Sequence, residues 1–379
     1  MRGDPIYLDH NATTPLLPEV VDAMIPFLRE HFGNPSSGHV YGERARAAVE
    51  DARARVAEAI GARADEIVFT SGGTEANNLA IRGVAERSAR RGIVSTAVEH
   101  PATRRPCEHL AARGFRWVEL AVDARGVARI EDAKAAIDGD VALVTVMHSN
   151  NETGSIQPVE ELAALARSAG ARVHSDAAQS IGKVPIDVDA LDVDLLSIAG
   201  HKLYAPKGVG ALFVRRGTPI APFALGAGHE HGLRPGTENV ASIVGLGVAC
   251  ARVTRDLADE APRVRGLRDA LFSRLASRIP ELALNGHPEA RLPNTLNVRF
   301  PRVSGSALIA STPEVAASTG SACHGADERA SAVILAMGVD PVAALGSVRL
   351  TLGRGTTMED VERAADALAN SWSVAVGAS

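Results

Sequence analysis

Lysine is scarce in this chain, so each lysine raises the question of what its amine does. Of the 40 lysine and arginine residues, the lysines are Lys134, Lys183, Lys202 and Lys207. An arginine guanidinium stays protonated and delocalised, whereas a deprotonated lysine amine forms imines with carbonyl compounds. Lys202 closely follows a short apolar run, where burial would lower its pKa and favour that reaction. The other three lie in polar, loop or turn surroundings, and we predict that they are solvated.

An acidic residue lies at the end of another apolar run. Asp176 belongs to the segment His174–Gln179, which follows a strand candidate. An acid at the carboxyl end of a parallel strand faces the ligand crevice of an open α/β sheet. A buried carboxylate there needs a cationic partner, because desolvating a lone charge is costly. The alternative to a ligand is a structural salt bridge.

The segment Ser71–Asn77 connects a predicted strand to a predicted helix. Its glycines allow close approach of the backbone to a ligand, and the free N–H groups of the helix start can donate to a phosphate. Gly73 and the Thr74 hydroxyl are the candidates for that contact. The alternative is a tight turn in which Thr74 caps the helix.

Taken together, these groups suit one cofactor. A phosphate cradle, a carboxylate and an imine-forming lysine, each at a strand end, are what pyridoxal phosphate requires. The carboxylate keeps the pyridine nitrogen protonated, and the lysine holds the aldehyde. No metal site is predicted.

The chain has three cysteines in different surroundings. Cys107 lies in a helical pattern and Cys250 in an apolar helix, so both are predicted to be small core residues. Cys323 lies in the Gly- and Ser-rich stretch 318–325, where a thiol would be accessible. His324 is not expected to act as its base, because neighbours in an extended chain face opposite ways.

Alternating elements must position these residues. The predicted strands of the first part are 66–70, 93–96, 115–120, 142–147, 172–174, 195–198 and 209–214, and helices include 74–90, 101–113 and 158–168. This alternation indicates βαβ units and a largely parallel sheet covered on both faces. We therefore predict an α/β fold with a large domain.

The rhythm changes after two long helical patterns at 238–257 and 262–278. Strands are predicted at 295–300, 314–318 and 347–352, separated by two helices and followed by a helix at 357–372. This pattern predicts a second, smaller α+β domain. We divide the chain into a large cofactor-binding domain, residues 14–255, and a small domain, residues 1–13 and 256–379, which carries the Cys323 loop.

Composition excludes several classes of protein. With 46% hydrophobic and 22% charged residues the chain is globular rather than disordered. A formal charge of -5 without a long basic run argues against direct nucleic-acid or membrane binding. No secretory signal is visible, the apolar stretch at 240–251 is too short to span a bilayer, and three cysteines form no disulfide framework. We predict a reducing, cytoplasmic setting.

The chain resembles the cysteine desulfurases, in the class V aminotransferase group of fold-type I pyridoxal phosphate enzymes. The matching segments are collinear and cover nearly the whole chain: residues 7–14, 33–37, 73–75, 99–100, 147–152, 176–179, 201–202, 234–237 and 321–323. The resemblance implies the fold-type I architecture. The long loop around Cys323 resembles that of the subgroup in which the cysteine swings toward an acceptor.

The resemblance implies roles around the cofactor ring. Lys202 would hold the aldehyde as an imine and shuttle protons, and Asp176 would pair with the pyridine nitrogen. Gln179 and Asn151 would bond the ring hydroxyl region. His100 would stack on the ring and assist proton transfer.

The phosphate and the substrate have their own implied partners. Gly73, Thr74 and His201 would hold the phosphate, joined by Thr237 of a second subunit, which implies a homodimer. Arg349 would clamp the carboxylate of L-cysteine, a bidentate task suited to arginine, and Asn151 would also contact the substrate. Cys323 would take the sulfur as a persulfide, leave L-alanine, and pass the sulfur to an acceptor protein that the sequence does not identify.

Two positions depart from the pattern of related enzymes. Ala199 replaces a serine that is often present, which removes one phosphate hydrogen bond at a cost of about 0.5–1.5 kcal/mol. His324 after the cysteine resembles the selenocysteine lyases, so a selenocysteine lyase is the nearest alternative function. A non-catalytic relative that only binds partners is a second alternative, against which Lys202, Asp176, His100 and Cys323 all argue.

Overall fold

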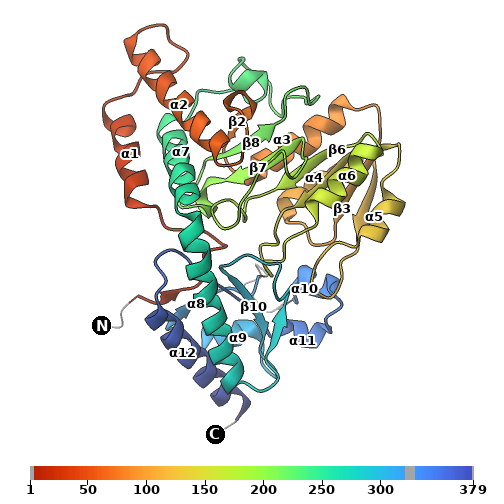
Figure 1. Cartoon of the computed structure of the whole chain (residues 1–379), viewed down its shortest axis with the longest axis vertical. Coiled ribbons are helices and arrows are strands. Elements are labelled where there is room, and N and C mark those ends of the chain that lie inside the picture. Colours follow the sequence, from red (N-terminus) through yellow and green to blue (C-terminus); the bar gives the residue numbers. More distant parts are fainter. Residues whose placement is uncertain (1–3, 321–328, 378–379) are drawn as a thin grey trace.

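A seven-stranded sheet forms the centre of the larger part of the molecule, as the computed structural model shows for residues 4–320 and 329–377 (Figure 1). In spatial order its strands are β2 (Ile67–Thr70), β8 (Gly210–Val214), β7 (Leu195–Ala199), β6 (Arg172–Asp176), β5 (Val141–Met147), β3 (Gly92–Thr96) and β4 (Arg116–Leu120). The strands from β7 to β4 are parallel, whereas β8 is antiparallel to both of its neighbours. The carboxyl ends of β5, β6 and β7 therefore meet at one edge of the sheet.

Helices cover both faces of this sheet because its strands are apolar on both sides. Side chains alternate along β2, so Ile67 and Phe69 enter one core whereas Val68 enters another. The first core also holds residues of α2 (Val40–Glu58), α5 (Ile130–Ala136), α6 (Val159–Ser168) and α7 (Val240–Arg255). The second holds residues of α3 (Gly73–Arg87) and α4 (Pro101–Ala111). Helix α1 (Pro18–Arg29) packs against α7.

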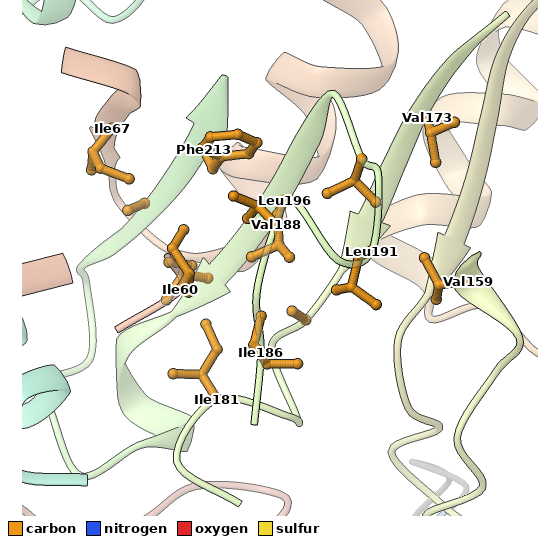
Figure 2. Close-up of a cluster of buried hydrophobic side chains, with 14 of the residues drawn as sticks. Ile60, Ile67, Val159, Val173, Ile181, Ile186, Val188, Leu191, Leu196 and Phe213 are labelled. Carbon is orange, nitrogen blue, oxygen red and sulfur yellow. The ribbon is translucent and has the colours of Figure 1, made fainter. Parts of the chain in front are cut away.

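The connection between β6 and β7 contains no long helix but is well anchored. Its apolar side chains Ile181, Ile186, Val188 and Leu191 are buried with strand residues in the first core (Figure 2). The polar residues between them are thereby held at fixed positions beside the end of β6. This anchoring becomes important for Lys183.

A second, smaller sheet lies beyond the end of α7. It has the order β12 (Ser347–Thr351), β10 (Thr295–Arg299) and β9 (Ala283–Asn285), with antiparallel pairs. Helices α8 (Leu257–Arg278), α9 (Gly305–Ala310) and α12 (Met358–Val376) supply residues to its core. The chain start joins this part, because β1 (Ile6–Tyr7) pairs in parallel with β11 (Val315–Ala316). In Figure 1, α8 follows α7 end to end and links the two sheets.

The predicted α/β fold is confirmed, and the differences concern element boundaries and short elements. Helix α8 begins at Leu257 rather than at residue 262, because Pro262 is accommodated inside the helix. The strand β9 was not predicted, since three residues carry too little pattern. Three short helices, α9, α10 (Ala332–Ala336) and α11 (Pro341–Leu345), stand where we expected two.

The two sheets have separate apolar cores, one within residues 20–250 and the other formed by residues 6, 8 and 264–372. The division into units 14–255 and 1–13 plus 256–379 stays a prediction. No helix in residues 4–320 and 329–377 is long and apolar enough to cross a membrane.

Candidate active site

A pocket of about 440 Å³ opens where β5, β6 and β7 end. Met147, Asp176 and Ala199, the last residues of these strands, all line it. The predicted site residues on its wall are Gly73, Thr74, His100, Asn151, Asp176, Gln179, His201, Lys202 and Arg349. Segments separated by up to 276 positions in the sequence thus meet in one cavity.

Lys202 reaches this pocket from a 3₁₀ turn, Gly200–Lys202, that follows β7 directly. Its Nζ donates hydrogen bonds to the main-chain oxygens of Asn11 (2.6 Å) and Ala12 (2.8 Å). Burial lowers the pKa of Lys202 to about 8, and the Arg349 cation adds to that effect, whereas Asp176 and Asp9 oppose it. A larger fraction of the amine is therefore neutral at physiological pH than in an ordinary lysine.

Asp176 is buried, with 8% of its surface exposed. Its Oδ2 accepts a hydrogen bond from Asn77 Nδ2 (2.7 Å), and its Oδ1 accepts one from the main-chain N–H of Ala178 (2.9 Å). Within the described residues no ion pair joins Asp176, so the structural salt bridge considered above is not found. The carboxylate is held by neutral donors and faces the pocket without a protein cation bonded to it.

His100 lies at the start of helix α4 and caps it. Its Nδ1 accepts a hydrogen bond from the main-chain N–H of Ala102 (3.1 Å), which leaves Nε2 as the protonated nitrogen of the neutral ring. Burial lowers the pKa of His100; the Asp176 charge opposes this effect and the Lys202 charge adds to it. A neutral imidazole therefore stands on the pocket wall.

The start of helix α3 forms one end of the pocket. The N-terminal capping position is Gly72, with φ of 149°, so the alternative in which Thr74 caps the helix is wrong. A Cβ atom on Gly73 would lie 3.2 Å from Ala199 Cβ, a tight contact, so a larger residue here would require the end of β7 to shift slightly. Thr74 and His201 border both this end and an adjoining open cavity of about 380 Å³.

His201 is held close to the chain start. Its Nδ1 lies 3.2 Å from Thr13 Oγ1. Burial lowers the pKa of His201 to about 4, and the Lys202, Lys207 and Lys183 charges add to this effect. The ring is therefore a neutral hydrogen-bonding group rather than a cation.

Arg349 comes from β12 of the smaller sheet and closes the opposite side of the pocket. Its Nη2 pairs with Asp9 Oδ1 at 2.8 Å, and its Nη1 donates to the main-chain oxygen of Asn151 at 3.1 Å. Its Nε is buried without a hydrogen-bond partner in the described part of the chain. By its two Nη contacts the guanidinium is therefore held in a fixed orientation at the pocket wall.

The amides of Asn151 and Gln179 lie between these two sides. The loop of Asn151 is shaped by Asn150, whose Oδ1 accepts hydrogen bonds from the main-chain N–H groups of Glu152 and Thr153 (2.9 Å each). Gln179 Nε2 donates to the main-chain oxygen of Asn11 at 3.0 Å. Asn11 therefore accepts from both Gln179 and Lys202.

A family model described as aminotransferase class-V matches residues 6–364. The chain belongs to the class V aminotransferase family. Cysteine desulfurase IscS of Dictyoglomus turgidum is 46% identical over 96% of this chain and 93% of its own length. Cysteine desulfurase NifS of Azotobacter vinelandii is 44% identical over 94% of this chain and 90% of its own length. A solved NifS-like protein superposes with a TM-score of 0.92 at 37% identity, covering 98% of this chain and all of that one.

The residues present fit the pyridoxal phosphate that class V aminotransferases use. The pocket offers an amine of lowered pKa in Lys202, a buried acid without a protein cation in Asp176, and a glycine at the start of α3, Gly73. The Asp176 carboxylate has no cationic partner within the described residues, so it can accept a hydrogen bond from the N–H of a protonated pyridine ring. The donor set thus matches an aldehyde, a protonated ring nitrogen and a phosphate.

One described residue of the predicted site, Thr237, does not reach this pocket in its own subunit. Thr237 is exposed and does not line it, so its contact with the cofactor of a second subunit stays a prediction. Cys323 and His324 lie outside the described residues. Cys107 and Cys250 are buried as expected, and burial raises both pKa values, that of Cys250 to about 12.

Three residues of the site were missed from the sequence. Asn77 orients Asp176, and Asn11 receives both Lys202 and Gln179. Lys183 was expected in solvent, but its Nζ donates to the main-chain oxygen (2.9 Å) and Oε1 (3.2 Å) of Gln179. Burial lowers the pKa of Lys183 to about 7, and the Lys202 and Arg349 charges add to this effect. The scarcity of lysine was the available signal for Lys183.

Proposed function

We propose that this protein is a pyridoxal phosphate-dependent cysteine desulfurase that transfers the sulfur of L-cysteine to Cys323. The observation that carries the proposal is one pocket in which a lysine of lowered pKa, a buried acid without a protein cation and a buried arginine all meet. The relatives that match nearly the whole chain are cysteine desulfurases.

On one side of the pocket the residues would hold the cofactor. Lys202 supplies the amine for its aldehyde, Asp176 accepts the ring N–H, and Gly73, Thr74 and His201 surround its phosphate. When bound, pyridoxal phosphate delocalises an electron pair from the substrate. Lys202, with its pKa near neutrality, and the neutral His100 are suited to accept and return protons beside it.

On the other side Arg349 would bind the substrate carboxylate. Asp9 and the Asn151 main-chain oxygen fix two corners of its guanidinium, and Arg349 lines the pocket. A planar fork of fixed orientation suits a carboxylate. Asn151 itself lines the pocket between the carboxylate side and the cofactor side.

Cys323 would accept the sulfur, because the other two cysteines are buried and hold their protons. In this step the thiolate of Cys323 forms a bond to the substrate sulfur, and the bond between that sulfur and the substrate Cβ breaks. The electron pair of the broken bond and one proton go to the carbon, which becomes the methyl group of alanine. The outer sulfur of the persulfide is then transferred to a thiol of an acceptor protein.

The test compares three cysteine variants treated with L-cysteine. Cys323→Ser should retain the cofactor and bind cysteine but release little sulfide and carry no persulfide by mass spectrometry. Cys107→Ser and Cys250→Ser should keep most activity. A persulfide on Cys107 or Cys250 in active enzyme would overturn the assignment. Faster alanine formation from L-selenocysteine than from L-cysteine would favour the selenocysteine lyase alternative.

We also propose that the site is completed by a second copy of the chain. Thr237 is exposed and lies outside this subunit's pocket, and the phosphate end of that pocket is open. Dilution to monomers should therefore weaken cofactor binding, and Thr237→Ala should weaken it by about threefold to tenfold, as expected for one lost hydrogen bond. Sedimentation combined with cofactor absorbance measures both, and a saturated, active monomer contradicts the proposal. We also propose that the protein works in the reducing environment of the cytoplasm.

A further inference from the structure

Lys183 is the one lysine whose environment differs most from the sequence prediction. It lies in the anchored connection between β6 and β7, and together with Lys202 it lines a small cavity of about 30 Å³ behind the active site. Its amine donates two hydrogen bonds, both to Gln179. The bond to the main-chain oxygen closes a turn, but the bond to Oε1 has no part in that turn.

The bond to Oε1 determines which way the Gln179 amide points. In its protonated form the Lys183 amine can only donate, so it selects the oxygen of the amide and not the NH₂ group. The NH₂ group is then left on the other side, where it donates to the main-chain oxygen of Asn11. A flipped amide would set NH₂ against the ammonium and oxygen against the carbonyl, and both contacts would be repulsive.

The orientation of this amide matters because of its neighbour. Lys202 Nζ and Gln179 Nε2 donate to the same oxygen, that of Asn11, so the NH₂ group of Gln179 is close to the reactive amine. Gln179 also lines the main pocket. An N–H donor held at this place can stabilise negative charge that forms beside Lys202.

We propose that Lys183 is a positioning residue that holds the Gln179 amide with its NH₂ group toward Lys202 and the cofactor. The proposal rests on the proposed function, because it assigns Gln179 a partner on the bound cofactor. Lys183 acts only through Gln179 and touches neither substrate nor cofactor.

The orientation itself can be measured because the chain contains only two glutamines, Gln157 and Gln179. With ¹⁵N-labelled glutamine, the full-length protein should show two side-chain NH₂ signals. Gln157 is the matched control: its Oε1 accepts from Ala128 N–H (3.0 Å) and its Nε2 donates to Gly126 O (2.8 Å), far from Lys183 in the sequence. Gln179→Ala assigns the signals by removing one pair.

In Lys183→Met the Gln179 signals should move and exchange faster with water, while those of Gln157 stay in place. Unmoved Gln179 signals overturn the proposal. If the methionine variant does not fold, Lys183→Arg keeps a cation to cap the turn. Because its donor group is larger, the arginine should still shift the Gln179 signals. Unmoved Gln179 signals in this variant likewise overturn the proposal. These spectra need no cofactor, so they are independent of the proposed function.

The effect on the cofactor is tested by a double-mutant cycle. The absorbance of bound pyridoxal phosphate is titrated with pH, which reports the proton on its link to Lys202. Lys183→Met should raise the midpoint by about one pH unit, since the Gln179 NH₂ group is then no longer held as a donor that favours the deprotonated form. The charged and titratable groups around Lys183, namely Lys202, Arg349, His10 and His201, are the same residues in every member of the cycle.

In the Gln179→Ala background the same substitution should move the midpoint by less than half as much, because only the direct effect of the Lys183 charge remains. Equal shifts in both backgrounds, or no shift in either, overturn the proposal. If the unsubstituted protein does not bind pyridoxal phosphate covalently, the proposed function fails instead, and the two failures are distinguishable.

Discussion

The two sides of the pocket are built in different ways. On the cofactor side, Asp176 and Lys202 are placed by the strands they follow, β6 and β7, which are neighbours in one sheet. On the carboxylate side, Arg349 comes from another sheet and is held by Asp9, 340 positions away in the sequence. The first side depends on local chain geometry, and the second depends on how two parts of the molecule meet.

The residues of the cofactor side are therefore held more rigidly than those of the carboxylate side. The cofactor side is embedded in the largest apolar core, so its residues cannot shift without disturbing the sheet. The carboxylate side depends on a few polar contacts between segments, which a single substitution can change. We expect substitutions on the two sides to separate chemistry from substrate binding.

The largest expected effect is on the cofactor side. Lys202→Ala should lower the rate of alanine formation by about 10³-fold or more, because it removes both the covalent attachment and the proton carrier. Borohydride reduction followed by mass spectrometry measures the attachment. A reducible link to pyridoxal phosphate that persists in this variant would show that another lysine, such as Lys183, carries the cofactor.

A smaller effect is expected on the carboxylate side. Arg349→Lys keeps the charge but loses the planar fork, so KM for L-cysteine should rise by about 10- to 100-fold with a much smaller change in kcat. Steady-state kinetics with L-cysteine separate the two constants. If kcat falls while KM stays constant, Arg349 belongs to the chemistry and the division between the two sides is wrong.

The smallest effect connects the two sides through charge. The pKa of Lys202 is about 8, so capture of pyridoxal phosphate by cofactor-free protein should speed up by about tenfold per pH unit below pH 8 and level off above it. Because the Arg349 cation helps to lower this pKa, Arg349→Met should move the plateau to higher pH. Stopped-flow absorbance measures the rate. A plateau above pH 10 in the unsubstituted protein would mean that Lys202 is not buried.

The sequence was informative wherever a site residue lies next to an apolar strand. Asp176, Lys202 and the turn at Gly73 were identified in this way, and the α/β fold came from the same strands and helices. Element boundaries were less accurate, as at α8, because Pro262 looks like a helix start but lies inside the helix. Short elements such as β9 carry too few residues for a periodic pattern.

Contacts between segments that are distant in the sequence could not be predicted from its pattern of apolar and polar residues. The bonds from Asn77 to Asp176 and from Asp9 to Arg349 join residues 99 and 340 positions apart. No periodicity records such pairs, because they depend on the packing of helices and sheets. The family resemblance supplied the role of Arg349 but not the partners that orient it.

The four lysines illustrate what each level determined. The sequence by itself determined that lysine is rare here and that Lys202 follows a buried strand. An apolar strand can be recognised from its own residues, without knowledge of its neighbours in the sheet. The tertiary structure alone decided that Lys183 is partly buried and hydrogen-bonded: the apolar residues around it fold onto the sheet and place its amine beside Gln179. A residue in a polar segment is exposed to solvent only when no distant segment packs over it. The packing of the core determines whether a distant segment does so.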